Sequence, residues 1–383
     1  MMKQKIAIIG GGASGLVAAI MSAENGEVVL FEKDDRIGKK ILQTGNGRCN
    51  FCNKNLSPKK YNNPQFVERV FTKVGLDDIL NFFKNLGLCY NWDEEGRMYP
   101  ASNLASSVLD VLRYECQRVG VIIKTNSPVL DIKIRDGKFE IQNEIFDKVV
   151  ISSGNISNEF LTKLGISSTE KRQGLCSLKT PKEEIAGLAG IRAKVEIKIA
   201  IEGELYKEVG ELQFKQDGLG GICVFDISSI ISRKNIKNPT IFVNFAPFFE
   251  NSALKDELNR RLNKQKNEPI ENVFVGMFHR LLGAMFLKRC GILPSTLCKN
   301  VAEKQICDLV EQIKNCVFHI QGTLGEGQVR VGGISLDEVD ENLMSKKHPN
   351  LYFVGECLDV DGLCGGYNLA WAWASAILVG EQI

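Results

Sequence analysis

The stretch that decides the fold is Lys5-Ile6-Ala7-Ile8-Ile9-Gly10-Gly11-Gly12-Ala13-Ser14-Gly15. Its apolar first half predicts a strand that is buried on both faces, and its second half contains Gly-x-Gly-x-x-Gly. In that pattern Gly10 permits a tight turn, Gly12 lets a phosphate approach the backbone, and Gly15 lets the next helix pack on the strand. The free N–H groups at the start of that helix would face a pyrophosphate.

The segments that follow complete a βαβ unit. Residues 14–25 have the apolar periodicity of a helix that ends at Gly26, and residues 28–31 predict a second strand. Glu32 closes this strand, 22 residues after Gly10, where its carboxylate can accept from ribose hydroxyls. A carboxylate there disfavours a 2′-phosphate, so the pattern favours FAD or NAD over NADP. The competing interpretation is a glycine-rich turn without a ligand.

A second glycine-bearing signal lies near the other end of the chain. An apolar strand over residues 351–354 runs into Gly355-Glu356, and Gly365-Gly366-Tyr367-Asn368 opens a helix over residues 369–380. The positive end of that helix would stabilise negative charge on a reduced flavin ring. A dinucleotide held by both ends of the chain points to FAD rather than to NAD alone. An ordinary strand, loop and terminal helix is the alternative.

Between the two signals, residues 34–57 are aperiodic and contain Gly45-Asn46-Gly47-Arg48-Cys49-Asn50. The Arg48 guanidinium can neutralise a phosphate or the carbonyl side of a flavin. Cys49 and Cys52 form a Cys-x-x-Cys, as in some flavin disulfide reductases. We favour two unlinked thiols, because the chain has no second Gly-x-Gly-x-x-Gly to supply a nicotinamide domain.

The pattern of apolar and polar residues divides the rest of the chain into helical and β-rich segments. Helices are predicted over 65–90 and 103–119, and a small meander over 121–124, 129–134, 138–141 and 148–151, ending at Ser152-Ser153-Gly154. From about residue 190 the pattern is that of a β-rich domain, with strands over 193–202, 205–214, 222–226 and 240–245. Residues 253–315 are predicted to be helical, and strands return over 317–331. The fold class is therefore α/β.

Composition excludes several classes. The net charge of the 383-residue chain is +2, so electrostatics give no case for nucleic acid or a membrane surface. We find no apolar run of membrane-spanning length and no signal segment, and a cytoplasmic location is expected. The 12 cysteines show no disulfide framework. The histidines lack metal-ligand spacing, so no metal is expected.

Three longer stretches carry a resemblance to a known group. They are residues 45–50, Arg97-Met98-Tyr99-Pro100, and Gly355 to Gly362 continued by residues 365–373. On these the chain resembles the three-domain bacterial flavoproteins called aminoacetone oxidase-like FAD-binding enzymes, whose relatives include bile-acid dehydro-reductases. The resemblance implies a glutathione-reductase-like FAD-binding domain over 1–165 and 325–383. A β-rich, barrel-like domain over 166–252 and 316–324, and a helical domain over 253–315, would interrupt it.

The resemblance also implies a set of FAD contacts. Val129 would meet the adenine end through its backbone. The set is Gly10, Gly12, Ala13, Ser14, Gly15, Glu32, Lys33, Lys40, Gly47, Arg48, Cys49, Asn50, Val129, Gly355, Glu356 and Asn368. Four more residues are candidates for FAD contacts. Ser153 and Gly154 follow the strand at 148–151, and Gly366 and Tyr367 lie at the start of the last helix.

These observations predict an FAD-dependent oxidoreductase that passes hydride between a small organic substrate and flavin N5. The substrate would enter between the FAD-binding domain and the inserted domains. Oxygen would re-oxidise the flavin, or NAD(P)H would reduce it. An amine oxidase and a double-bond reductase both fit this chemistry. The rivals are a disulfide-type enzyme using Cys49 and Cys52, and a flavin-binding sensor or RNA-modification partner without turnover. The sequence assigns neither a catalytic residue nor an oligomeric state.

Overall fold

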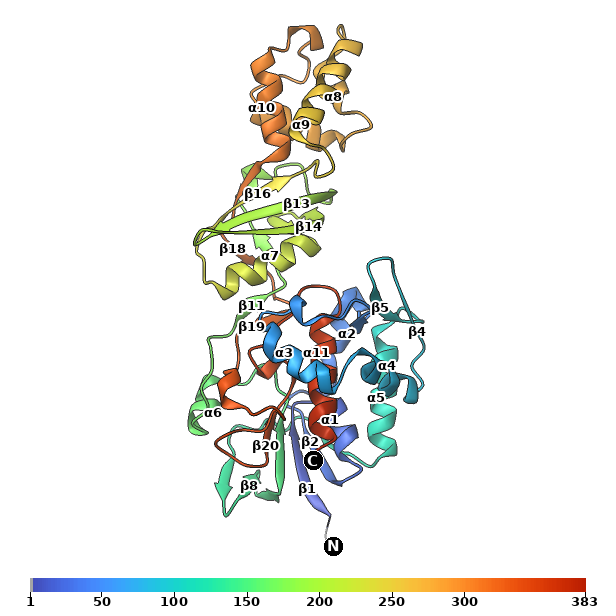
Figure 1. Ribbon diagram of the computed structural model, residues 1–383, viewed down its shortest axis with the longest axis vertical. Coiled ribbons are helices and arrows are strands. Elements are labelled where there is room, and N and C mark those ends of the chain that lie inside the picture. Colours follow the sequence, from blue (N-terminus) through green and yellow to red (C-terminus); the bar gives the residue numbers. More distant parts are fainter. Residues whose placement is uncertain (1–2) are drawn as a thin grey trace. The chain divides into compact units, whose positions relative to one another are not determined.

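The computed structural model describes residues 3–383, which divide into two compact units (Figure 1). Unit 1 comprises Met1–Arg172 and Val329–Ile383, and unit 2 comprises Gln173–Gln328. Each unit encloses its own cluster of buried apolar side chains. The first unit is therefore assembled from two separate segments of sequence, and the glycine-bearing signals at both ends of the chain belong to it.

A parallel five-stranded sheet forms the centre of unit 1, as the apolar strands predicted. Its β1 pairs with β10 on one side and with β2 on the other, so that Ile8 lies beside both Val150 and Leu30. Because all strands run the same way, their carboxyl ends meet at one edge. In spatial order the strands are β20 (Leu351–Phe353), β10 (Lys148–Ile151), β1 (Gln4–Ile9), β2 (Gly26–Phe31) and β6 (Ile122–Lys124).

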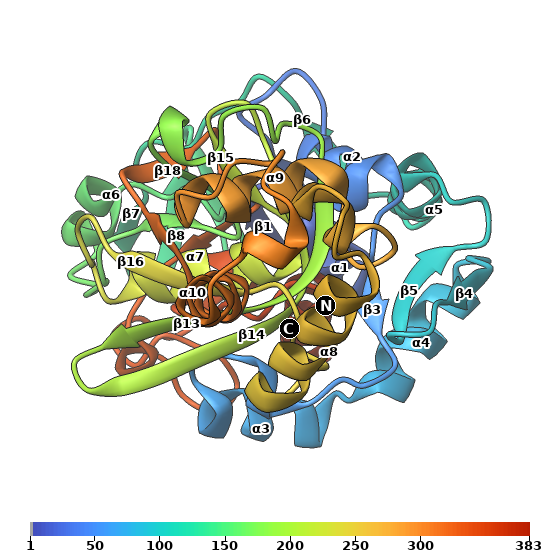
Figure 2. The ribbon, with the colours of Figure 1, turned by 90° about the horizontal axis from the view of Figure 1, so that it is seen from above.

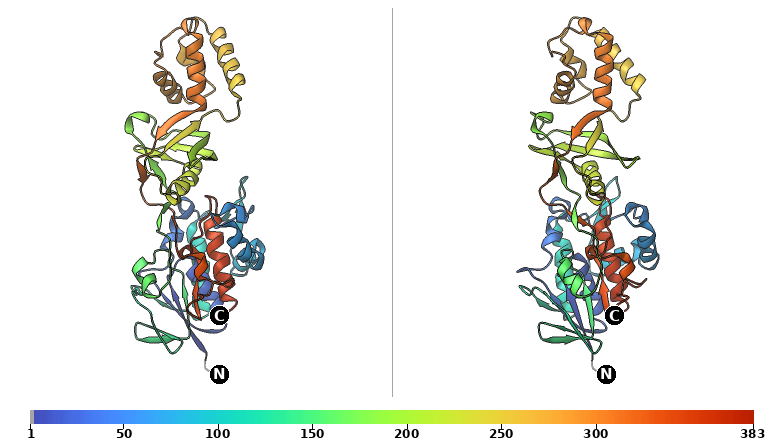
Figure 3. Two further views of the ribbon diagram at one scale, coloured as in Figure 1. Left: turned by 60° about the vertical axis from the view of Figure 1, so that its left-hand side comes forward. Right: turned by 90° about the vertical axis from the view of Figure 1, so that its left-hand side faces the viewer.

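Two helices from opposite ends of the sequence lie side by side on this sheet (Figures 1 and 3). They are α1 (Ala13–Ser22) and α11 (Tyr367–Gly380), and a Cβ on Gly380 would come within 2.2 Å of Met21 Cβ. Nearly every residue of α11 is buried, which explains why its sequence is apolar on all sides. The other helices of unit 1 are α2 (Lys39–Gln43), α3 (Pro64–Lys73), α4 (Leu76–Asn85), α5 (Ala105–Arg118) and α6 (Asn158–Lys163).

Two small antiparallel sheets complete unit 1. An antiparallel meander is present, as β7 (Lys133–Arg135), β8 (Lys138–Ile141) and β9 (Glu144–Phe146), but the predicted membership is wrong in part, because the strands predicted over 121–124 and 148–151 belong to the parallel sheet. The aperiodic loop contributes β3 (Cys52–Asn53), which pairs with β5 (Arg97–Pro100) and through it with β4 (Tyr90–Trp92). The helix predicted over 65–90 is wrong in extent, because Val74-Gly75 separates α3 from α4 and β4 begins at Tyr90.

Unit 2 is built on seven strands whose pairings are antiparallel. The longest pair is the hairpin of β13 (Arg192–Ile201) and β14 (Glu204–Phe214), which Figure 2 shows running side by side. Glu202 and Gly203 both have positive φ in its two-residue turn, the geometry that matches strand twist. The order is β17 (Cys316–His319), β16 (Thr240–Asn244), β13, β14, β15 (Gly218–Gly220), β12 (Ser177–Lys179) and β18 (Gly322–Leu324). Two short strands lie where the chain passes between the units: β11 (Arg172–Gly174), and β19 (Val329–Val331), which belongs to unit 1.

Four helices accompany this sheet. One of them, α7 (Ile222–Arg233), overturns the strand predicted over residues 222–226. Gly221 has a φ of +102° and ends β15 abruptly, so the apolar run after it starts a helix with one buried face. The others are α8 (Asn251–Lys264), α9 (Arg280–Arg289) and α10 (Glu303–Lys314), which confirm helix in 253–315.

The inserted segment has one continuous apolar cluster. It joins sheet residues such as Val243 to helix residues such as Phe286 and Ile313, and the rings of Phe245 and Phe286 lie 5.4 Å apart. The division of this segment into a barrel-like domain and a helical domain stays a prediction, as does closure of the sheet into a barrel.

Candidate functional site

The glycine-rich turn after β1 is tight at one position and open at another. Gly10 has a φ of +110°, and a Cβ on Gly15 would lie 1.8 Å from the Gly10 carbonyl oxygen. A Cβ on Gly12, by contrast, would meet no atom within 4 Å. Gly12 also precedes α1, whose first residues are Ala13 and Ser14. The turn thus forms an open cradle of backbone N–H groups at the positive end of a helix.

Glu32, at the end of β2, fixes the shape of this turn. Its Oε2 accepts from the Gly11 N–H at 2.8 Å, and its Oε1 accepts from the Asp34 N–H at 2.9 Å. Lys33 is exposed beside it, and Val129 lies partly buried in the irregular stretch between β6 and β7 rather than in a strand. In this structure Glu32 therefore orders the loop that surrounds the cradle.

The end of β20 packs directly on the start of α1. Gly355 has a φ of +69°, and a Cβ there would lie 2.4 Å from Ser14 Oγ. Two residues of α11 hold this position: the Gly355 N–H donates to Ser375 Oγ at 2.9 Å, and Trp371 Nε1 donates to the Gly355 carbonyl at 3.1 Å. The structure therefore brings the two glycine-bearing ends of the chain together.

Glu356 is the centre of a charged cluster next to this junction. Its Oε2 pairs with Lys40 Nζ at 2.7 Å, and its Oε1 accepts from the Arg330 backbone N–H at 2.8 Å. A Cβ on Gly154 would lie 2.2 Å from Glu356 Oε2, so a side chain at position 154 would displace the carboxylate. Lys171 Nζ donates to the Gly154 carbonyl at 3.1 Å, and burial lowers the pKa of Lys171.

Residues 152–154, which follow β10, contact both the charged cluster around Glu356 and the glycine-rich turn after β1. Ser152 Oγ donates to the Ile9 and Gly10 carbonyls at 2.9 and 2.8 Å. Ser153 Cα would be 3.0 Å from a Cβ on Gly10, which explains the glycine there. Sequence reasoning missed Lys171 and Arg330, because neither belongs to a motif and both reach the cluster through long-range folding.

The loop over residues 44–50 adopts a strained path beside the start of α11. Gly45, Asn46, Gly47 and Cys49 all have positive φ. The Asn50 amide, oriented to satisfy its neighbours, donates to the Cys52 carbonyl at 2.9 Å and accepts from the Gly366 N–H at 3.1 Å. The loop therefore closes against the helix N-terminus through main-chain groups.

Two charged or aromatic side chains complete this surface. The Arg48 guanidinium lies over the Tyr99 ring, 4.5 Å from its centroid. Such stacking holds a guanidinium in place while leaving its edge able to bind a carbonyl or phosphate oxygen.

Tyr367 and Asn368, by contrast, are engaged in the protein's own structure. The Tyr367 ring is buried, and its carbonyl accepts from the Tyr61 hydroxyl at 2.7 Å. The Asn368 amide accepts from the Gly362 N–H at 2.9 Å and donates to the Gly362 carbonyl at 2.8 Å. Both residues thus shape the loop before α11, and their part in binding stays a prediction.

Cys49 and Cys52 are free, buried thiols. Burial raises the pKa of Cys49 to about 11 and that of Cys52 to about 12. Because the thiolate is the reactive form, these pKa values weigh against a redox pair at neutral pH. The disulfide-type alternative therefore rests on the Cys-x-x-Cys spacing alone.

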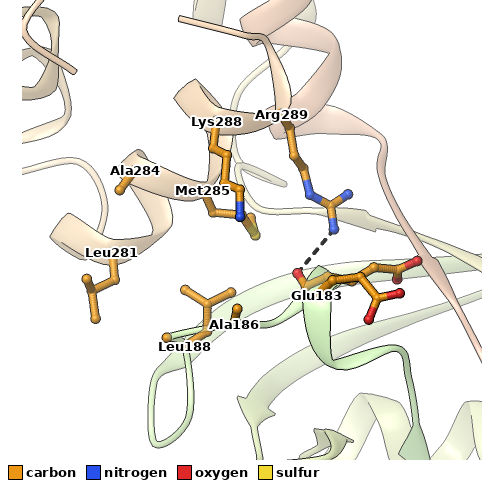
Figure 4. Close-up of a pocket in the computed structure, with 10 residues that line it drawn as sticks. Glu183, Ala186, Leu188, Leu281, Ala284, Met285, Lys288 and Arg289 are labelled. Atoms are coloured by element: carbon orange, nitrogen blue, oxygen red, sulfur yellow. Dashed lines mark hydrogen bonds between the residues drawn. The ribbon is translucent and has the colours of Figure 1, made fainter. Parts of the chain in front are cut away.

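Across residues 3–383 no cluster of three or more His, Cys, Asp or Glu side chains could hold a metal ion, and no helix has the length and hydropathy to span a membrane. In unit 2 a surface pocket of about 280 Å³ separates α9 from the loop over residues 183–188 (Figure 4). Arg289 crosses it to the Glu184 carbonyl at 3.4 Å, and no residue predicted for the cofactor lines it.

Residues 4–382 match the family described as the HI0933-like protein Rossmann domain. The chain belongs to this family. FAD is its cofactor, and it is an FAD-dependent oxidoreductase, as the sequence predicted. The open cradle at Gly12 fits the diphosphate of FAD, since it offers helix-terminal N–H groups and space that a Cβ would fill.

Characterised relatives cover almost the whole chain. A 3-dehydro-bile acid delta(4,6)-reductase from Clostridium scindens is 34% identical over 402 residues, with 98% of each chain covered. A ribosomal RNA dihydrouridine synthase from Escherichia coli is 28% identical, with 96% of this chain and 95% of that protein covered. The dihydrouridine synthase from Haemophilus influenzae is 27% identical, with 96% of each covered.

Proposed function

We propose that this oxidoreductase is a reductase of carbon–carbon double bonds conjugated to a carbonyl group, acting on a small organic molecule. The observation that carries the proposal is the chemistry common to the relatives' names. A delta(4,6)-reductase and a dihydrouridine synthase both add two hydrogens across a C=C bond. The relative with the higher identity, 34%, acts on a small molecule.

The chain's own residues would bind and orient the reactants. FAD, when bound, supplies the hydride chemistry. The cradle at Gly12 and the start of α1 would hold the diphosphate, and the N-terminus of α11 at Gly366 would stabilise negative charge. The Arg48 guanidinium, held over Tyr99, is suited to bind a carbonyl oxygen and withdraw electron density from a conjugated double bond.

A reductase also needs a source of electrons. We propose that NADH or NADPH reaches the flavin transiently, because the chain has a single Gly-x-Gly-x-x-Gly and no second dinucleotide motif. An amine oxidase would instead draw electrons from its substrate and pass them to oxygen.

Anaerobic stopped-flow absorbance near 450 nm tests the proposal. The holoenzyme is mixed separately with NADH, NADPH and a panel of primary amines. A reductase is bleached by a nicotinamide, and its colour returns anaerobically when a conjugated enone such as 2-cyclohexen-1-one or a 3-oxo-4,6-diene bile acid is added. Bleaching by an amine alone, with recovery only in oxygen, would establish an oxidase and overturn the proposal.

A second candidate is reduction of uridine in RNA. Two relatives carry that activity in their names over at least 95% of their length. In addition, residues 251–315 carry eleven Lys and Arg against seven Asp and Glu, whereas the whole chain has a surplus of two. A polyanion would be attracted to this segment.

The two candidates separate in one further experiment. The nicotinamide-reduced enzyme is given either a ribosomal RNA transcript or a 3-oxo-4,6-diene bile acid, and flavin re-oxidation is followed. RNA-dependent re-oxidation with a mass gain of 2 Da per modified uridine would favour the RNA candidate. Re-oxidation by the enone alone would favour the small molecule.

A further inference from the structure

Lys171 is a partly buried cation without a carboxylate partner. Its Nζ donates to the Gly154 carbonyl at 3.1 Å, and within the described part of the chain no carboxylate lies within ion-pair distance of that nitrogen. Burial lowers the pKa of Lys171, Cys357 and Glu356 oppose this effect, and the nearby Arg330 and Lys40 cations add to it. A cation in such surroundings is normally matched by an anion.

The surroundings of Lys171 carry a surplus of positive charge. Lys40 and Glu356 pair at 2.7 Å, and the Arg330 backbone binds the other oxygen of Glu356. Of the three cations in this cluster, only Lys40 forms an ion pair with Glu356, so the charges of Lys171 and Arg330 are left uncompensated there. A diphosphate diester such as the one in FAD carries two negative charges.

The cluster lies next to the cradle. Gly154, to which Lys171 bonds, is two residues from Ser152, whose Oγ donates to the Gly10 carbonyl. Glu356 follows Gly355, which packs on Ser14 in the first turn of α1. The strand ends after β10 and β20 thus carry the surplus charge to the place where α1 presents its free N–H groups.

We propose that Lys171 binds the diphosphate of FAD and supplies the charge that the backbone cradle lacks. This assignment rests on FAD being the cofactor and is independent of the substrate, so it survives if the enzyme proves to be an oxidase. The Lys40 ammonium and the Arg330 backbone N–H bind the two oxygens of Glu356, so this carboxylate is already engaged and does not neutralise Lys171. The recognition is of two charges, so it favours FAD over flavins without a diphosphate.

The direct test is the dissociation constant of FAD in Lys171→Met and Lys171→Arg. We expect Lys171→Met to weaken FAD binding by about 10- to 100-fold and Lys171→Arg to stay within about threefold of wild type, as for a charge-assisted contact. Lys314→Met is the matched control: Lys314 is also a partly buried lysine that donates to carbonyls, with a pKa lowered by burial, but it lies at the end of α10 in unit 2. An unchanged FAD dissociation constant in Lys171→Met would overturn the proposal.

A second measurement uses a variant that keeps a positive charge at position 171. The ³¹P NMR spectrum of bound FAD is recorded for the wild-type and Lys171→Arg holoenzymes. Movement of at least one phosphorus resonance is expected, with the flavin reduction potential unchanged. Unmoved phosphorus resonances together with a shifted potential would put Lys171 at the ring instead, and would also overturn the assignment. This readout stands even if Lys171→Met fails to fold.

Discussion

Gly12 and Gly15 belong to one turn, but the space beside Gly12 is open and the space beside Gly15 is filled. Gly12 has an ordinary extended φ of −84° and open space beside it, whereas a Cβ on Gly15 collides with the Gly10 carbonyl. We expect Gly12→Ala to leave the stability of the FAD-free protein within about 0.5 kcal/mol of wild type, while weakening FAD binding by filling the cradle. Gly15→Ala should destabilise the same protein by about 2–4 kcal/mol through overpacking.

Urea unfolding of both FAD-free variants, followed by FAD titration, measures the two effects separately. The replacement Gly12→Glu serves as the stronger variant, since it adds a negative charge beside the diphosphate and should abolish the yellow colour. Full FAD occupancy in Gly12→Glu would contradict the placement of the cofactor.

The cysteines give a prediction about reactivity. The pKa of Cys49 is raised to about 11 and that of Cys52 to about 12, so both remain protonated thiols well above neutral pH. Thiolate formation, and with it alkylation, is lost as pH falls below these values. At pH 8 we expect iodoacetamide to modify the exposed Cys89 and Cys307 first.

Mass spectrometry of timed, quenched samples reads out the order of labelling. Replacement of Cys52 by serine should leave the rate of flavin reduction by NADH or NADPH within about twofold of wild type. Serine is the suitable replacement because it has nearly the size of cysteine. Early labelling of Cys49, or a Cys49–Cys52 disulfide that turns over with the flavin, would revive the disulfide-type enzyme.

Residues in local motifs were the ones that sequence could assign. The tight surroundings of Gly10 and Gly15 follow from a pattern six residues long, and the placement of Glu32 from the strand that precedes it. Lys171 could not be found this way, because its neighbours Gly154 and Glu356 come from strands that only folding brings together. Asn368 shows the reverse, since a motif cannot reveal that its amide already binds Gly362.

At the scale of elements, α11 controls the junction through one hydroxyl. Ser375 Oγ accepts from the Gly355 N–H and donates to the Trp371 carbonyl, and the residue is fully buried. Ser375→Ala would leave the Gly355 N–H without its partner in a dry site. We expect a loss of about 1–3 kcal/mol in the free energy of unfolding, accompanied by weaker FAD binding.

Ser22, at the end of the neighbouring helix α1, provides the control for Ser375. It is equally buried, but its Oγ only adds a second donor to the Ala18 carbonyl within α1. Ser22→Ala should cost about 0.5 kcal/mol or less and leave FAD binding unchanged. Equal losses in stability and affinity from both replacements, measured by urea unfolding and flavin fluorescence, would show that the Gly355 contact has no special role.

Elements differed in how well their sequences predicted them. The bounds predicted for strand β10 match the observed ones, because its continuous apolar run is flanked by polar and turn residues. The run Ile222-Cys223-Val224-Phe225-Asp226 predicts a strand but forms the start of α7, since a short apolar run fits a buried strand and a buried helix equally well. The conformation of Gly221 decides between them, and φ angles are not visible in a sequence.

At the scale of the whole molecule, two separate cores predict two unfolding steps. The cofactor cradle and its supporting contacts belong to unit 1, whereas unit 2 has its own apolar cluster. FAD at 100 times its dissociation constant should stabilise unit 1 by about 2.7 kcal/mol and leave the unit 2 transition in place. Calorimetry with and without added FAD measures this.

One calorimetric result would contradict the prediction of two unfolding steps. A single cooperative transition that moves as one on adding FAD would mean that the units unfold together, despite their separate cores. Gly12→Glu is the control, because its unit 1 transition should not respond to FAD at all.

The interrupted sequence of unit 1 has a consequence for biosynthesis. Strand β20 and helix α11 are translated only after all of unit 2, so the nascent first segment waits without the strand and helix that cover its sheet. At about 5–20 residues per second, that wait lasts roughly ten to thirty seconds. During it the ribosome-bound chain exposes a half-finished sheet edge, and it cannot yet hold FAD. FAD binding is therefore expected to follow translation of residues 367–380.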